Sequence, residues 1–156
     1  MRKIPGLIVD QATSRRLARM PQRDTSPELA VRRHLTKAGI RYRTRNRDLP
    51  GSPDLANRRG RWALFVHGCF WHRHPDCPRA TTPTRNQRFW LDKFAANTRR
   101  DERVLSELRS QGFLTAVVWE CETVTAERLA QTLAPILAAI VPADLDHTAN
   151  PNDSPR

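Results

Sequence analysis

The segment from Phe65 to Cys77, FVHGCFWHRHPDC, limits what this chain can fold into more than any other part of it. Three of the chain's five histidines and two of its three cysteines lie within these thirteen residues. Soft thiolates and an imidazole suit tetrahedral zinc, and four protein ligands would complete its coordination. The sequence therefore predicts a structural zinc site that fixes the shape of this segment; the alternative is a set of unrelated buried thiols and a surface histidine. The predicted ligands are Cys69, His74, Cys77 and Cys121.

Alternating and helical patterns predict an α/β fold with a mixed central sheet flanked by helices. The run TSPELAVRRHLTKAG has Thr25 and Glu28 at capping-box spacing, and Gly39 suits the end of that helix. The apolar run FLTAVVWE predicts a central strand, and Pro135 predicts a kink in the last helix. The other predicted elements are strands at 40–47, from residue 54 and at 62–67, and helices from about 86 to 111 and from 125 to 141.

Chain length and cysteine usage indicate one domain in a reducing compartment. For 156 residues a single core is expected, with a basic N-terminal arm (1–24), a main domain (25–141) and a disordered tail (142–156). No stretch approaches the roughly 20 apolar residues of a membrane span, and no signal-peptide pattern is present. An odd number of cysteines is poorly suited to disulfide pairing, so a cytoplasmic location is expected.

The charge of the chain is large and unevenly distributed. The formal net charge is +11, made up of +9 in residues 1–50, +7 in residues 51–100 and −5 in residues 101–156. Most of the basic residues are arginines, which suit bidentate contacts to phosphates and bases. This distribution favours a surface for a polyanion, with nucleic acid as the first candidate. The alternative is a surface charge that only keeps the protein in solution.

A carboxylate and a polar strand end follow the first predicted helix in the order found in PD-(D/E)xK nucleases. Asp54 ends a tight SPD turn and begins a strand, and His67 ends the neighbouring strand. In that layout the carboxylate holds Mg²⁺ beside the scissile phosphate, and an acidic residue on the preceding helix, here Glu28, supports the metal. The alternative is an ordinary turn, because Pro-Asp pairs are frequent in turns.

Four runs, GSPD, FVHGCFWHRH, FWLDKFAANTRRD and VVWEC, resemble the very-short-patch repair (Vsr) endonucleases. The similarity covers about residues 10–122 and implies a PD-(D/E)xK core with a structural zinc. Enzymes of that family nick DNA 5′ to the thymine of a T:G mismatch, which arises from deaminated 5-methylcytosine. The resemblance therefore implies a strand-specific, Mg²⁺-dependent endonuclease that leaves a 3′-hydroxyl and a 5′-phosphate.

The resemblance also implies roles for individual residues. Asp54 and the backbone carbonyl of Val66, where the family usually has threonine, would bind Mg²⁺. His72 would activate the attacking water and Asp101 would orient it, since a carboxylate often fixes a catalytic imidazole. The implied catalytic set is Asp54, His72, His67, Asp101 and Glu28, with His67 near the phosphate in place of the usual lysine and Glu28 reaching the metal through water.

Two aromatic residues, Phe70 and Trp71, lie between a predicted zinc ligand and the implied base, where core residues are unusual; core packing is the alternative. Unstacking a base costs least where pairing is already faulty, so inserted rings can select a mismatch. By the resemblance, the DNA-contacting residues are Phe70, Trp71 and Trp90 as intercalating rings, Leu17 and Met20 at the minor groove, and Lys93 and Asn97 at the bases. By spacing alone, the last two form merely a solvated helix face.

The expected partner is double-stranded DNA with a T:G mismatch, bound by a monomer and without membrane contact. The resemblance implies a bacterial cytoplasmic protein at the nucleoid, with functional links to a cytosine-5 DNA methyltransferase and other repair proteins. Three other hypotheses stay open: a non-catalytic zinc-stabilised DNA-binding module, a related nuclease with a different DNA target, and a structural zinc protein that binds no nucleic acid. Steep salt dependence of DNA affinity would exclude the last of these.

Overall fold

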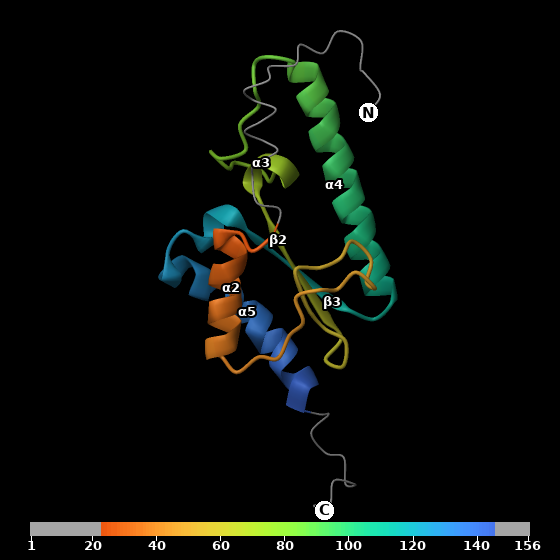
Figure 1. Cartoon of the computed structure of the whole chain (residues 1–156), viewed down its shortest axis with the longest axis vertical. Coiled ribbons are helices and arrows are strands. Elements are labelled where there is room, and N and C mark those ends of the chain that lie inside the picture. The colour runs from red at the N-terminus through yellow and green to blue at the C-terminus, as the bar shows by residue number, and fades with distance from the viewer. Residues whose placement is uncertain (1–22, 146–156) are drawn as a thin grey trace, which may run out of the picture.

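A computed structural model describes residues 23–145 of the chain. Most of the predicted arm, including Leu17 and Met20, and most of the predicted tail lie outside the described residues. Within the described part, helices flank a mixed sheet, as the sequence predicts, but the sheet has three strands and not the four predicted (Figure 1). None of the helices in residues 23–145 has the length and apolar character needed to cross a membrane.

The sheet is mixed, with strand order β1-β2-β3. β1 (Leu55–Asn57) pairs antiparallel with β2 (Trp62–His67), and β2 pairs parallel with β3 (Leu114–Trp119). The central strand, β2, is buried at five of its six positions, which explains its unbroken apolar sequence. Its last residue, His67, is in register with Trp119 at the end of β3, so the carboxyl ends of both strands meet at one edge of the sheet.

Two strand predictions are wrong in the described structure. Residues 40–47 form no strand; they make one isolated bridge, between Arg43 and Ala56. Beyond this bridge the Asn46 side chain is buried and donates to the carbonyl of Pro53 at 3.0 Å, so the alternating pattern does not continue as a ladder. β3 is an edge strand of the described sheet rather than a central one. The side chain of Leu114 accordingly remains 39% exposed.

Local sequence signals explain where the first long helices begin and end. α2 (Ser26–Lys37) begins at the predicted cap, where Thr25 Oγ1 accepts from the backbone N–H of Glu28 at 3.4 Å. The Glu28 carboxylate accepts in return from the N–H of Asp24 at 2.9 Å. α4 (Gln87–Ser110) closes before Gly112, whose φ of +81° suits glycine.

The remaining helices differ from the sequence predictions in extent. The Cys69–His72 segment forms a short helix, α3, inside the expected loop, and a 3₁₀ turn, η1 (Glu120–Thr123), follows β3. α5 (Ala126–Leu145) continues as one helix through Pro135 and ends at Leu145 rather than at residue 141. The start of the predicted tail is therefore helical.

Two apolar clusters cover the two faces of the sheet. On one face, α2 and α5 pack against alternate strand residues such as Leu64 and Val118. On the other, the C-terminal part of α4 places Leu108 against Ala63 and Phe65. Figure 1 shows α2 and α5 together on one side and the long α4 on the other. The N-terminal part of α4 extends beyond the sheet and contacts α3, so this helix joins the core to the segment that carries the predicted site.

Candidate active site and cysteine–histidine cluster

A cleft of about 1080 Å³ opens at the carboxyl ends of β2 and β3. Strand alternation explains part of its lining: Phe65 faces α4, and His67, two residues later, lies on the same face. The cleft brings together all five predicted catalytic residues, each from a different element or turn of the chain. Its lining includes Glu28 from α2, Asp54 before β1, His67 from β2, His72 from α3 and Asp101 from α4.

Asp54 is fixed by a hydrogen bond across the hairpin. Its Oδ2 accepts from the backbone N–H of Val66 at 2.7 Å. Burial raises the pKa of the Asp54 carboxyl to about 6; the bond from Val66 acts against this rise, and the negative charge of Glu28 adds to it. Two carboxylates that repel each other across a cleft are a site where a divalent cation would bind, and hard oxygen ligands suit Mg²⁺.

Glu28 also has structural roles in the described state. Its carboxylate accepts from Thr25 Oγ1 at 2.9 Å and pairs with Arg32 at 3.2 Å. The side chain is only 6% exposed. The same residue therefore caps α2 and lines the cleft, and this links the fold of the first helix to the position of a candidate metal-supporting carboxylate.

The two histidines and Asp101 form one compact group. The imidazole rings of His67 and His72 stack with centroids 3.9 Å apart, and His72 Nδ1 lies 2.5 Å from Asp101 Oδ2. Burial, and after it the neighbouring His72, lowers the pKa of His67 to about 4. His67 is consequently a neutral imidazole at pH 7, able to donate or accept a proton in a hydrogen bond.

The four predicted zinc ligands come together beside this cleft. One potential ligand atom from each of Cys69, His74, Cys77 and Cys121 lies within 4.8 Å of the others, and Cys121 Sγ is 3.4 Å from His74 Nε2. Three sulfurs and one imidazole nitrogen are a frequent donor set of structural zinc sites. Burial raises the pKa of the Cys69 thiol to about 12, so a thiolate at this position would require a cation beside it.

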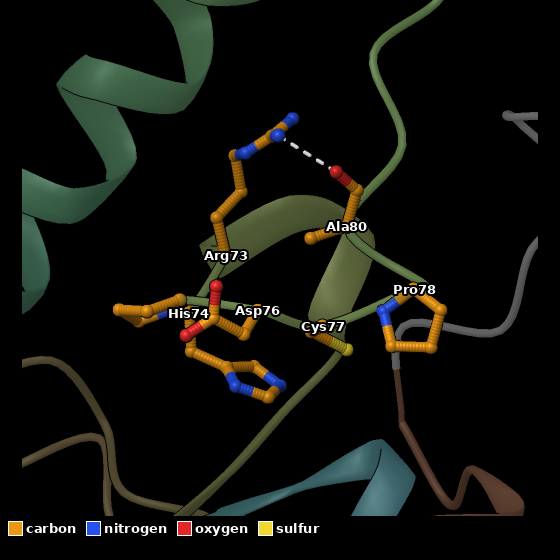
Figure 2. Close-up of a pocket in the computed structure, with 7 residues that line it drawn as sticks. Arg73, His74, Asp76, Cys77, Pro78 and Ala80 are labelled. Carbon is orange, nitrogen blue, oxygen red and sulfur yellow. Dashed lines mark hydrogen bonds between the residues drawn. The ribbon is translucent and has the colours of Figure 1, made fainter.

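The segment after α3 is held by an arginine. Arg73 has a φ of +56° and ends α3, and its guanidinium donates to the carbonyl of Ala80 at 2.6 Å (Figure 2). The same guanidinium also donates to Thr82 Oγ1 at 2.9 Å and lies over the ring of Phe94, 4.7 Å from its centroid. These contacts attach the segment containing His74 and Cys77 to α4.

The predicted DNA-contacting rings form an aromatic cluster between α3 and α4. Phe70 and Trp71 are half-buried and their centroids lie 5.0 Å apart, whereas Trp90 is only 8% exposed and stacks on Phe94. In this state Trp90 therefore packs against the two α3 rings and supports them. The ammonium of Lys93 lies 5.3 Å from the Trp71 ring centroid.

Polar groups of α4 anchor α3 by its backbone. Asn97 Nδ2 donates to the Trp71 carbonyl at 3.0 Å, and Thr98 Oγ1 lies 3.5 Å from the His72 carbonyl. Asn97 is thus a half-buried anchor here, not part of a solvated face. At the other end of α3, Glu120 Oε2 accepts from the Cys69 N–H at 3.3 Å. Thr98 and Glu120 were not among the predicted site residues.

Arg100 was not among the predicted site residues, but it lines the cleft and its guanidinium lies 3.4 Å from Asp101 Oδ1. The available signal was its helical spacing: Asn97, Arg100, Asp101 and Val104 repeat at intervals of three and four residues, which places them on one face of α4.

An α/β fold whose cleft joins carboxylates to a histidine pair has the side chains typical of metal-assisted hydrolases. Comparison with known proteins indicates the same class, that of hydrolases. A family model described as "DNA mismatch endonuclease Vsr" matches residues 8–79. The DNA mismatch endonuclease Vsr of Escherichia coli is 37% identical over 132 residues, covering 81% of this chain and 84% of that protein.

Two nicking enzymes are also similar. The Type II nicking enzyme V.NmeAIP of Neisseria meningitidis is 36% identical over 128 residues, covering 80% of this chain and 91% of its own length. The Type II nicking enzyme V.XorIIP of Xanthomonas oryzae pv. oryzae is 44% identical over 100 residues, covering 64% of this chain and 73% of its own. The chain belongs to the Vsr DNA mismatch endonuclease family.

Proposed function

We propose that this protein is a strand-specific DNA endonuclease of the PD-(D/E)xK type that nicks 5′ to the thymine of a T:G mismatch. The mismatch would arise from deamination of 5-methylcytosine, and the reaction would be Mg²⁺-dependent hydrolysis of one phosphodiester bond. The observation that carries the proposal is the meeting of Asp54, His67, His72 and Asp101 in one cleft next to the α3 rings. The names of the relatives, which include a mismatch endonuclease and nicking enzymes, support it.

The residues around Asp54 fit a hard divalent cation. Asp54 and the backbone carbonyl of Val66 would hold Mg²⁺, with Glu28 acting through water; all are oxygen donors. When bound, Mg²⁺ would polarise the phosphate and offset the charge that develops in an in-line displacement. The Val66 N–H bond fixes Asp54 Oδ2, which leaves Oδ1 as the oxygen better placed to bind a cation.

His72 has the geometry of a general base. Because Nδ1 faces the Asp101 carboxylate at 2.5 Å, the Nδ1 atom carries the proton of the neutral imidazole. Nε2 then carries the lone pair, and it would take a proton from the attacking water. The imidazolium formed in this way would be stabilised by Asp101, which also keeps the ring in one orientation.

His67 would act as a neutral hydrogen-bonding group beside the phosphate. Its ring stacks on His72 at 3.9 Å, so the two imidazoles share one side of the cleft. An N–H of His67 could donate to a phosphate oxygen or to the leaving 3′-oxygen, which gains negative charge as the bond breaks.

The aromatic rings of α3 would select the substrate by insertion beside the faulty pair. These rings are supported by α4, because Trp90 and Phe94 both contact Phe70, with the Phe70 and Phe94 ring centroids 5.3 Å apart. Trp71→Ala should therefore lower the preference for T:G over T:A by roughly tenfold, on the scale of a lost base–aromatic stack. Rates on both duplexes would be compared in one assay, and unchanged selectivity would refute the wedge role of Trp71.

The proposed function is tested by a nicking assay on duplexes that differ at one pair, T:G, T:A or C:G. The first duplexes tested would carry the mismatch in a cytosine-methylation site. With Mg²⁺, the wild-type protein should cut only the thymine strand of the T:G duplex. His72→Ala should abolish nicking and retain most DNA binding. Tight binding without cleavage of any duplex would instead favour a DNA-binding module, and cleavage of another pair would favour a different target.

In the cell the proposed activity would serve repair of methylated DNA. The protein would act as a monomer on duplex DNA in the bacterial cytoplasm, at the nucleoid. Its substrate would follow from the action of a cytosine-5 DNA methyltransferase, and its product, a nick, would require further repair proteins. Zinc at the cysteine–histidine cluster would have a structural role only, because four protein ligands leave no position for water or substrate.

A further inference from the structure

The lining of the cleft is rich in acidic groups. Four carboxylates line it, those of Glu28, Asp54, Asp101 and Glu120. Glu28 pairs with Arg32 at 3.2 Å and Glu120 pairs with Arg79 at 2.9 Å, and neither arginine lines the cleft. Each of these two carboxylates thus has a counter-charge outside the cleft, although Glu28 still acts on Asp54. The carboxylates of Asp54 and Asp101 would face an incoming phosphodiester, which is itself an anion.

Among the described residues that line the cleft, Arg100 is the one arginine or lysine. An arginine is charged at every physiological pH, whereas the histidines of the cleft are charged only when protonated. The Arg100 side chain is 54% exposed, so its guanidinium is accessible to a substrate. Its contact with Asp101 is a long one, 3.4 Å, and it uses a single nitrogen of the five-donor guanidinium.

The position of this guanidinium is set by the proposed catalytic group. Asp101 uses Oδ2 for His72 and Oδ1 for Arg100, so one carboxylate holds both side chains. A phosphate placed for attack by water at His72 therefore lies within reach of the neighbouring arginine. Planar guanidinium groups match two phosphate oxygens at once, which suits them to this position.

We propose that Arg100 binds the scissile phosphate and is the permanent positive charge of the cleft. This inference rests on the proposed function, because it assumes a phosphodiester substrate at His72. Arg100 would exchange its weak contact with Asp101 for stronger contacts to two phosphate oxygens. Those contacts orient the phosphorus for in-line attack and offset charge in the transition state.

A matched set of variants tests the proposal. Arg100→Gln removes the charge, Arg100→Lys keeps the charge without the planar fork, and Arg99→Gln makes the same charge change at the adjacent residue. Arg99 is exposed and does not line the cleft, because successive residues of a helix project about 100° apart. The three variants and the wild type are compared by thermal unfolding, by DNA affinity as a function of salt without Mg²⁺, and by single-turnover nicking at saturating enzyme with Mg²⁺.

Arg100→Gln should lower the single-turnover rate about tenfold to a hundredfold, the range for losing a charged hydrogen bond. It should also reduce the slope of log affinity against log salt by about one, the loss of one phosphate contact. Arg100→Lys should restore the slope and only part of the rate. Arg99→Gln should keep the wild-type rate, and all variants should unfold near the wild-type temperature.

A neutral methylphosphonate at the expected cleavage position gives a second measurement. Arg100→Gln should bind this duplex as tightly as the wild-type protein does, because the charge that Arg100 would contact is absent.

A lower nicking rate of Arg100→Gln with an unchanged salt slope would mean that Arg100 acts only through Asp101, and would overturn the proposal. An unchanged rate would overturn it as well. Failure of the wild type to nick T:G counts against the proposed function, while the salt slopes still decide whether Arg100 binds backbone phosphate.

Discussion

Asp54 is held in the cleft at a cost to the stability of the fold. Its carboxyl is largely buried and its pKa is raised from 3.8 to about 6. A pKa that is higher in the folded state means that the folded protein binds the proton more tightly than the unfolded chain does. Stability from this group is therefore lost as the pH rises from about 4 to about 6, and the full penalty remains above that window.

Asp54→Asn should accordingly stabilise the metal-free protein while it abolishes nicking. The amide oxygen can still accept from the Val66 N–H, but no charge has to be buried. We expect the free energy of unfolding at pH 7.5 to rise by roughly 1 kcal/mol, less than the full value of the pKa shift because the site is partly solvated. Urea unfolding without Mg²⁺ measures this change.

The stabilisation by Asp54→Asn should shrink to nothing below about pH 4, where Asp54 is protonated in both the folded and the unfolded wild type. Added Mg²⁺ should stabilise the wild type and not the variant. Asp48→Asn, at an exposed carboxylate paired with Arg58, is the control and should bring no gain. An equal gain at both pH values would show that burial of charge is not the cause.

The turn that precedes Asp54 and β1 packs against α4 at Gly51. Gly51 has a φ of +68°, and a Cβ added there would lie 2.4 Å from Val104 Cγ1. Gly51→Ala should therefore destabilise the protein by roughly 2–4 kcal/mol, the sum of backbone strain and overpacking. Its nicking rate should fall too, because relief of the clash displaces a turn that lines the cleft.

Gly39→Ala separates these two contributions. Gly39 has a similar φ of +73°, but nothing lies within 4 Å of an added Cβ. Gly39→Ala should lower the stability only by the backbone strain, about 1–2 kcal/mol, and should leave the activity normal. Adding Val104→Ala to Gly51→Ala should recover part of the lost stability, and the double-mutant cycle measures how much. If both glycine variants lose equal stability, the contact with Val104 is not the cause.

The cysteine–histidine cluster joins the β3 end to the segment after α3. Cys121→Ser should abolish zinc binding, lower the unfolding temperature and, through the displaced α3, reduce nicking. Metal analysis and calorimetry test this expectation. His74→Ala should behave in the same way, whereas His34→Ala, on α2 and outside the cluster, should retain its zinc. Full zinc content and stability in Cys121→Ser would exclude this fourth ligand.

Most of the long elements could be predicted because their signals are local. The cap at Thr25, the apolar strand 62–67 and Gly112 after α4 depend on neighbours in sequence. The wrong strand at 40–47 and the misplaced β3 depend on pairing across the chain, which an alternating pattern does not report. The cleft lining follows the same division. Histidines and cysteines are conspicuous in the sequence, whereas Arg100 differs from Arg99 only in the face of α4 that it occupies.

At the scale of the whole molecule, a group of exposed arginines lies away from the cleft. Seven arginines between residues 41 and 61 are all exposed. They lie around β1 and the β1–β2 turn, and that turn is at the opposite end of β2 from His67. Arg41 is fixed there, since its carbonyl accepts from Asn57 Nδ2 at 3.1 Å. Contacts between such a surface and DNA phosphates would add affinity without information about sequence.

A double variant, Arg41→Gln with Arg45→Gln, should therefore weaken binding to T:G and T:A duplexes by the same factor. The slope of log affinity against log salt should fall by up to about two, one for each lost phosphate contact. The ratio of nicking rates on the two duplexes should stay at the wild-type value, because we propose that the rings of α3 select the mismatch. Fluorescence anisotropy at several salt concentrations gives both slopes. A change in selectivity would mean that the arginine surface reads the site, and an unchanged slope would mean that the DNA does not reach this end of the sheet.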